Sequence, residues 1–435
     1  MSNALVERVV PARLGTPFRW LLGSSWVSNI GDGIAVAAGP LLVASESRDP
    51  RLVAAAWMLQ LLPHLLFGLF AGVIADRVNR RRLVAIANVC RVGVLLTLVG
   101  TIVTGEVNIV VVLTAMFLLG TGETFADTTT STLLPMVVAK RDLGVANARF
   151  MAGIITLNQL AGPPLGAFLF ALGRSWPFLA EATCIALSIV LVLRVQLPEH
   201  GRKLDAGPRS VRKDIVEGLG WLWRHAAVRT LVLTIFIFNI TFGAAWSVLV
   251  LYSLERLDMG AVGFGLLTSA MATGGILGTV SYSWLESHVS LGNIMRVGLV
   301  IETLTHLALA VNTVPWIAMG VMVVFGAHAF VWGTTSTSVR QRAVPTHMQG
   351  RVASVYQIGM MGGIVVGSVL GGLIAGRWGV TGPFWFGFVG SAVFLVLIWR
   401  QLLYIAHADE ENLAAAEAAE ASGTAEAGAR ATDEQ

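Results

Sequence analysis

The sequence predicts an all-α membrane protein with twelve transmembrane helices in two pseudo-symmetric six-helix bundles. Three observations support this prediction: the composition, the number of long apolar segments and an internal repeat. The chain of 435 residues is 55% hydrophobic and 13% charged, whereas soluble domains carry about 25% charged residues. A water-soluble fold could not cover so many apolar side chains, so we expect the lipid bilayer to surround the protein.

Twelve segments are apolar enough to cross a bilayer, for which a helix needs about 20 residues. In chain order they are approximately 20–44, 52–75, 83–104, 107–129, 148–172, 177–197, 230–253, 261–284, 293–313, 315–337, 353–376 and 383–404. Six precede a long polar segment and six follow it. The expected domains are an N-terminal bundle at 1–197, a linker at 198–229, a C-terminal bundle at 230–404 and a disordered cytoplasmic tail at 405–435, which is rich in Ala and Glu.

The two halves of the chain resemble each other at a spacing of 205 to 210 residues. Phe125–Thr132 returns as Phe330–Thr337, and Arg91 returns as Arg296, each at 205. Four groups of such matches occur in the same order. A repeat this long in an apolar chain indicates two fused membrane halves, with a ligand site between them near mid-bilayer.

Basic residues in the short loops predict the orientation. They gather in the even-numbered loops and the linker, so we expect both termini and the linker to face the cytoplasm. The expected location is the inner or plasma membrane of the cell. Within the linker, Asp214 to Arg229 has the pattern of an amphipathic helix, with Trp221 and Trp223 suited to the membrane interface.

Several function classes find no support in the sequence. It contains no Gly-x-x-x-x-Gly-Lys-Ser/Thr loop for ATP and no cluster with metal-ligand spacing. The bases lie in short clusters between apolar runs, which argues against nucleic-acid binding despite the net charge of +4. We therefore expect no enzyme activity, metal or bound cofactor. The expected partners are the bilayer, protons and a small-molecule substrate, and the expected state is a monomer.

The loop after the second span combines a glycine, an aspartate and a run of arginines. A carboxylate there can pair with a guanidinium or cap a neighbouring helix, and so latch one conformation; the alternative is a simple topology anchor. The pattern resembles Gly-x-x-x-Asp-Arg-x-Gly-Arg-Arg, the hallmark of the major facilitator superfamily. The chain matches it at Gly72, Asp76, Arg77, Arg80 and Arg81. It departs at Asn79, where Asn tolerates the left-handed backbone better than most residues do.

The fifth span carries Gly162-Pro-Pro-Leu-Gly166. Pro163 and Pro164 should break the helical hydrogen-bond ladder and kink the helix, and the two glycines allow a partner helix to cross closely. The pattern resembles the Gly-Pro-x-x-Gly-Gly motif of drug–proton antiporters in the same superfamily, with Ala167 at the last position. This resemblance implies an antiporter kink at Gly162, Pro163 and Gly166; the alternative is a packing kink without directional meaning.

Three further stretches resemble one branch of the superfamily, which holds the enterobactin exporter and macrolide and multidrug efflux pumps. They are Ser28–Gly33, Leu134 to Ala148 and Pro345 to Val352. The superfamily resemblance covers roughly 18–404. These motifs do not identify the cargo.

Ionisable residues inside predicted spans need an explanation, since a charge at mid-span costs about 2.5–3.5 kcal/mol on insertion scales. Burial disfavours the charged form of a carboxyl group, so a buried carboxylate can exchange a proton as a cavity opens to each side. We expect Asp32 and Glu123 to carry proton coupling, with a structural hydrogen-bonding role as the alternative. Glu302 and His306 lie four apart on one helical face, as either a structural or a coupling pair.

The remaining polar and aromatic candidates have more than one interpretation. His64 and His328 are expected to be packing histidines. Arg91 and Arg296 either extend to the interface or provide a counter-charge to Asp76 or Glu123. The candidate cavity-lining residues are Asn29, Asn239, Phe242 and Trp246.

Together these features predict a proton-coupled secondary transporter that exports small amphipathic molecules, as in drug or multidrug efflux, by alternating access. One alternative is a dedicated exporter of a siderophore or another secondary metabolite. A proton-coupled uptake symporter and a non-transporting membrane sensor are further alternatives.

Overall fold

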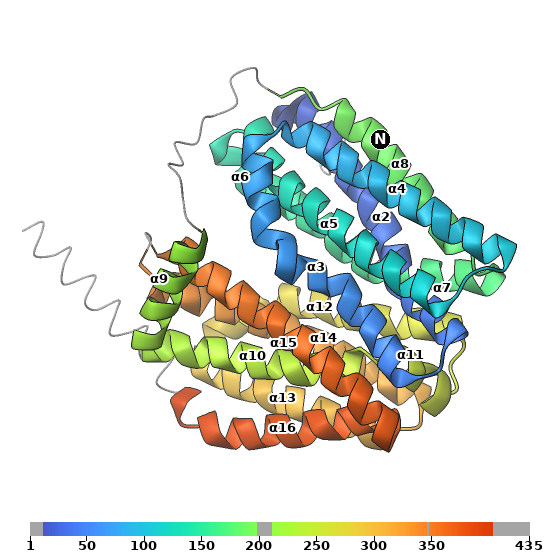
Figure 1. Cartoon of the computed structure of the whole chain (residues 1–435). Helices are drawn as coiled ribbons and strands as arrows, with labels where there is room; N and C mark the ends of the chain where they lie inside the picture. Colours follow the sequence, from blue (N-terminus) through green and yellow to red (C-terminus); the bar gives the residue numbers. More distant parts are fainter. Residues whose placement is uncertain (1–11, 198–210, 346–347, 403–435) are drawn as a thin grey trace, which may run out of the picture.

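The computed structural model describes residues 12–197, 211–345 and 348–402, and every regular element in them is helical (Figure 1). The first half contains η1 (Ala12–Leu14), α2 (Gly15–Glu46), α3 (Pro50–Arg77), α4 (Arg80–Thr104), α5 (Ile109–Val137), η2 (Lys140–Asp142), α6 (Leu143–Gly153), η3 (Ile154–Ala161), α7 (Gly162–Leu172) and α8 (Trp176–Leu193). The second half contains α9 (Val211–Arg224), α10 (Ala226–Trp246), α11 (Leu249–Leu251), η4 (Tyr252–Arg256), α12 (Ala261–His288), α13 (Leu291–Val311), α14 (Pro315–Ala343), α15 (Gln349–Trp378) and α16 (Gly382–Ile398).

Twelve of these helical stretches match the predicted spans. Within the described residues, eleven are long and apolar enough to cross a bilayer, and α16 is a shorter apolar helix of 17 residues. One stretch, Lys140–Leu172, runs through η2, α6, η3 and α7. The prediction of an all-α, twelve-helix membrane protein is confirmed. Several helices extend beyond the predicted spans, as α5 does to Val137, because polar residues such as Thr130 to Thr132 interrupt the apolar run while the backbone remains helical.

Side-chain caps explain where several helices begin. The carboxylate of Asp49 accepts a hydrogen bond from the backbone N–H of Arg51 at 2.9 Å at the start of α3. Asn108 caps α5 in the same way. Asn79 accepts from the N–H of Arg82 at 3.1 Å and begins α4 with φ of −65°. The reason given for Asn79 from the sequence is therefore wrong: the residue acts as an N-cap and does not use the left-handed backbone.

The linker helix is shorter than the sequence predicts. Helix α9 ends at Arg224, and His225 directly precedes α10, so the predicted extent to Arg229 is wrong. Glu217 of α9 lies 2.8 Å from Arg351, which places α9 against the start of α15. The rest of the predicted linker, 198–210, and the tail at 405–435 lie outside the described residues.

The two sets of helices lie side by side, with α9 at one end of the molecule (Figure 1). We call this the linker end and the opposite one the far end. Contacts between the halves run from α3 to α15 and from α7 to α12. Gly265 of α12 packs on Pro163, and Ser269 donates a hydrogen bond to the carbonyl of Leu160 at 2.8 Å. Arg48 and Glu255 lie 3.7 Å apart across the halves. These contacts join the two halves toward the far end of the molecule.

Candidate functional site

The loop between α3 and α4 is organised around Arg80. Its Nη2 lies 2.6 Å from Oδ1 of Asp76, and its Nε donates to the carbonyl of Ala75 at 3.1 Å. Its Nη1 lies 2.9 Å from Sδ of Met136, near the end of α5. The carboxylate of the motif therefore pairs inside its own loop, and the guanidinium connects that loop to α5.

The other motif residues lie at the same end. Arg81 donates to the carbonyl of Val195 at 2.9 Å, beyond α8. Arg77 is exposed, and Gly72 faces α5. Arg80 and Arg81 thus connect the loop between α3 and α4 to the end of α5 and to the segment after α8 at the linker end.

A buried ion-pair group occupies the centre of the first half. Arg91 of α4 is 2% exposed and pairs with Oδ1 of Asp32 on α2. The same Nη2 lies 3.7 Å from Oε1 of Glu181 on α8. Ser28 donates to the second oxygen of Asp32 at 3.2 Å. Gly122 leaves room on α5 for the stem of Arg91, because a Cβ there would lie 2.5 Å from its Cγ. We call Asp32, Arg91 and Glu181 the arginine cluster.

Glu123 lies next to the arginine cluster without joining it. The residue follows Gly122 on α5 and is half-buried, and within the described part of the chain it forms no ion pair. Asp127, one turn further along α5, is exposed. Of the two acids favoured by the sequence, the structure pairs only Asp32.

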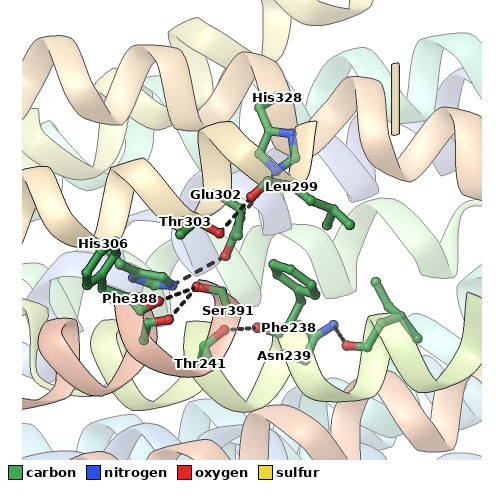
Figure 2. A network of polar contacts seen from close by, with 12 residues as sticks. Phe238, Asn239, Thr241, Leu299, Glu302, Thr303, His306, His328, Phe388 and Ser391 are labelled. Carbon is green, nitrogen blue, oxygen red and sulfur yellow. Dashed lines mark hydrogen bonds and ion pairs between the residues drawn. The ribbon is translucent and has the colours of Figure 1, made fainter. Parts of the chain in front are cut away.

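A second buried group holds a carboxylate between two imidazoles (Figure 2). Oε1 of Glu302 lies 3.4 Å from Nε2 of His306, and Oε2 lies 3.2 Å from Nε2 of His328 on α14. Two glycines make room for the rings, since a Cβ at Gly387 or Gly298 would lie within 2.9 Å of one of them. Among the described residues, no three His, Cys, Asp or Glu side chains are arranged to hold a metal ion. We call Glu302, His306 and His328 the histidine cluster.

The fifth span is interrupted just before its prolines. Residues Ile154–Ala161 form a π-helix that continues directly into α7, where Pro163 lies in the first turn and cannot donate a backbone hydrogen bond to the preceding helix. Gly162 and Gly33 meet where α2 crosses this span, because a Cβ at Gly162 would lie 2.5 Å from Cα of Gly33. Gly166 packs on the carbonyl of Ile34. Helix α15, the repeat partner of the fifth span, is a continuous α-helix.

A cavity of about 420 Å³ lies between the halves. Its wall is formed by Val36, Gly39, Pro40, Val53, Ala56, Trp57, Gln60, Leu61, Met116, Asn158, Gln159, Pro163, Phe242, Trp246, Ser247, Leu249, Val250, Phe264, Thr268, Met271, Ala272, Met322 and Phe330. Phe242 and Trp246 are therefore wall residues. Asn29 and Asn239 are not among them, and each amide donates to a carbonyl one turn earlier in its own helix. Asparagine side chains commonly bond to their own backbone in this way, which keeps both amides on their own helices.

Both buried clusters adjoin this cavity. Val36 in the wall lies one helical turn after Asp32 on α2. Trp246 meets His306 edge to face, with ring centroids 6.2 Å apart. The ionisable group of the first half thus lies one helical turn from a wall residue, and that of the second half lies behind Trp246.

The surroundings of the arginines differ from what the sequence suggested. Arg91 is buried and pairs with Asp32 and Glu181, so it neither extends to the interface nor pairs with Asp76. Its charge also acts on Glu123, as expected of a counter-charge, without an ion pair between them. Its repeat partner Arg296 is half-buried and donates to the carbonyl of Trp399 at 2.8 Å.

Two residues of the buried clusters were not recognised from the sequence. Glu181 received no role, although an acid within the apolar run 177–197 was the available signal. His328 was interpreted as a packing residue, yet it hydrogen-bonds Glu302. His328 aligns with Glu123 in the internal repeat, and this alignment was the available signal in the sequence.

Comparison with known proteins identifies the family. The family model described as transmembrane secretion effector, within the major facilitator superfamily, matches residues 9–427. The chain belongs to this family. Like other major facilitator proteins, this transporter is a multi-pass membrane protein. It is 26% identical over 395 residues to the multidrug efflux pump Tap of Mycolicibacterium fortuitum, covering 85% of this chain and 91% of Tap. It is 20% identical over 380 residues to macrolide efflux protein A of Streptococcus pyogenes, covering 86% and 92%.

Solved structures show the same fold at low sequence identity. A bacterial homologue of the iron transporter ferroportin in an inward-facing state superposes with a TM-score of 0.72 at 14% identity, covering 89% of this transporter and 98% of that chain. A bacterial homologue of the lysosomal transporter Spinster, inward-facing and unoccupied, gives 0.70 at 13% identity, covering 91% and 97%. These likenesses establish the major facilitator fold for this chain.

Proposed function

We propose that this transporter is a proton-coupled exporter of small amphipathic molecules that works by alternating access in the cell membrane, with its termini and linker in the cytoplasm. Relatives named as multidrug and macrolide efflux pumps, although at modest identity, support export of drug-like cargo. The volume of about 420 Å³ falls in the range of pockets that hold drug-sized ligands.

The observation that carries the proposal is the arginine cluster beside the cavity. One guanidinium faces the carboxyl groups of Asp32 and Glu181 in a buried site. With both carboxylates ionised the cluster has a net charge of −1, and one proton makes it neutral. Because burial makes an uncompensated charge costly, such a cluster favours binding a proton when closed and releasing it when water enters. Asp32 and the nearby Glu123 remain our proposed coupling residues in the first half.

The histidine cluster offers a second place for a proton. Glu302 with one protonated imidazole is neutral, whereas Glu302 with two neutral imidazoles is charged. His306 is fully buried behind Trp246 of the cavity wall. A change in its protonation would therefore alter the position of a side chain that contacts the cargo.

The packing supports rigid-body movement of the halves. Glycine crossings such as Gly162 on Gly33 join helices closely within the first half, and Gly367 on Ile240 does so in the second. Between the halves, the ion pair of Arg48 with Glu255 is partly exposed, and such pairs contribute little to stability. We propose that far-end contacts of this kind open while the loop around Asp76 closes the linker end.

The test is transport into inside-out vesicles with an acidic lumen. Accumulation of fluorescent amphiphiles should require the pH gradient and be lost when a proton ionophore is added. Asp32→Asn and Glu302→Gln should abolish accumulation. The matched control Glu106→Gln, at an exposed loop position, should leave it intact. Accumulation that survives the ionophore or requires ATP would refute the proposal.

A further inference from the structure

The wall of the cavity carries no charged side chain among the described residues that form it. Its polar groups are the amides and hydroxyls of Gln60, Asn158, Gln159, Ser247 and Thr268 and the indole N–H groups of Trp57 and Trp246. All three amides come from the first half, on α3 and η3. The second half contributes mostly rings and sulfur-containing side chains, namely Phe242, Trp246, Phe264, Met271, Met322 and Phe330. The wall therefore has a hydrogen-bonding side and an apolar side.

The carboxylates of the two buried clusters are already engaged, and the unpaired Glu123, two helical turns from Met116 on α5, is not a wall residue. Asp32 pairs with Arg91 and accepts a further hydrogen bond from Ser28. Glu302 lies between His306 and His328, behind Trp246. A cation in the cavity would find no free carboxylate in the wall, and a buried charge without a partner is strongly disfavoured.

The ring cluster of Phe242, Trp246 and Phe325 does not replace the missing counter-charge. Trp246 lies with its ring centroid 4.5 Å from Phe242 and 4.5 Å from Phe325. Phe242 and Phe325 are nearly parallel, at an interplanar angle of 7° and 6.0 Å between centroids. Cation–π attraction needs the cation over an open ring face, and these three rings direct faces toward one another.

From these observations we infer that the cavity selects uncharged cargo, with an apolar or aromatic body and several hydrogen-bonding groups along one edge, over cations of the same size. This inference rests on the proposed function, under which the ligand of the cavity is the transported cargo. The polar edge would face Gln60, Asn158 and Gln159, and the apolar body would lie against the rings of α10 and the methionines of α12 and α14. The wall would thus orient the ligand as well as select it.

Direct binding tests the inference on the purified full-length protein in nanodiscs. The probes are radiolabelled chloramphenicol, which is uncharged, and radiolabelled tetraphenylphosphonium, a permanent cation of similar size. Wild type should bind chloramphenicol at least about tenfold more tightly than tetraphenylphosphonium. A tenfold ratio of affinities corresponds to a difference of about 1.4 kcal/mol in binding free energy. Gln60→Glu places a carboxylate in the wall at nearly constant volume and should reverse the preference. Gln341→Glu, at an exposed position of α14, is the control and should change neither affinity.

Each outcome separates this inference from the proposed function. Wild type that binds the cation as tightly as the uncharged probe, or that binds neither probe, would overturn the inference. An unchanged preference in Gln60→Glu would also overturn it, because the wall would then not be the site. Selective binding without uptake driven by a pH gradient would leave the inference standing and refute proton-coupled export.

Discussion

Removing the charge of Arg91 tests the arginine cluster most severely. Arg91→Met keeps most of the side-chain volume against Gly122 and deletes the guanidinium, which leaves the carboxyl groups of Asp32 and Glu181 facing each other in a buried site. Ser28 still donates to Asp32 but provides no charge. The variant therefore isolates the electrostatic contribution of the arginine.

The expected magnitude follows from the burial of all three groups. Arg91, Asp32 and Glu181 are 2%, 8% and 1% exposed, so water screens their charges little. Removing one partner of such a pair costs about 3–5 kcal/mol of the free energy of unfolding. Adding Asp32→Asn to Arg91→Met removes one stranded carboxylate, and the double variant should recover about 1–3 kcal/mol through this coupling.

The assay is reversible unfolding of the purified protein in mixed micelles with increasing SDS, followed by far-ultraviolet circular dichroism. The four proteins of the cycle are wild type, the two single variants and the double variant. Arg91→Met with a free energy of unfolding within about 0.5 kcal/mol of wild type would refute the reasoning. So would strict additivity in the double variant.

Three other predictions follow from the helix packing and the loops. Gly166→Ala should destabilise the protein by about 1–3 kcal/mol, because the new methyl group meets a carbonyl of α2; Gly93→Ala, which meets nothing within 4 Å, should be neutral or stabilising in the same unfolding assay. Asp76→Asn should insert at normal levels, because the Asp76 side chain is 55% exposed, and should lose most transport; wild-type efflux would reduce the motif to a topology anchor. On a background without native cysteines, Lys140→Cys should react with an impermeant maleimide only from the cytoplasm and Glu106→Cys only from outside, and the reverse pattern would contradict the proposed orientation.

The sequence was sufficient for the fold because each span carries its own signal. An apolar run of the right length predicts a membrane helix without knowledge of its neighbours, and caps such as Asn108 lie next to the helix they begin. The π-helix Ile154–Ala161 was not predicted, because its backbone depends on how α2 crosses it at Gly33 and Gly162.

The partners inside the bundles could not be predicted in the same way. Arg91 and Arg296 are equivalent in the repeat, yet one is buried with two acids and the other lies half-buried beside Trp399 without an acidic partner among the described residues. The difference comes from side chains on other helices, such as Glu181 on α8, that have no counterpart in the local pattern. Glu302 and His306 were recognised because they are four apart on one helix, whereas His328 comes from α14 and needed the structure.

The central claim is that protons and cargo move in opposite directions, and a cargo gradient without a pH gradient tests it most directly. Proteoliposomes loaded with an identified cargo and a pH-sensitive dye are diluted into cargo-free buffer of the same pH. Outflow of cargo should draw protons inward and acidify the lumen, and Asp32→Asn should abolish the signal while Glu106→Gln retains it. An alkaline lumen would show symport, and an unchanged lumen during cargo outflow would show uncoupled transport; either result would contradict the account.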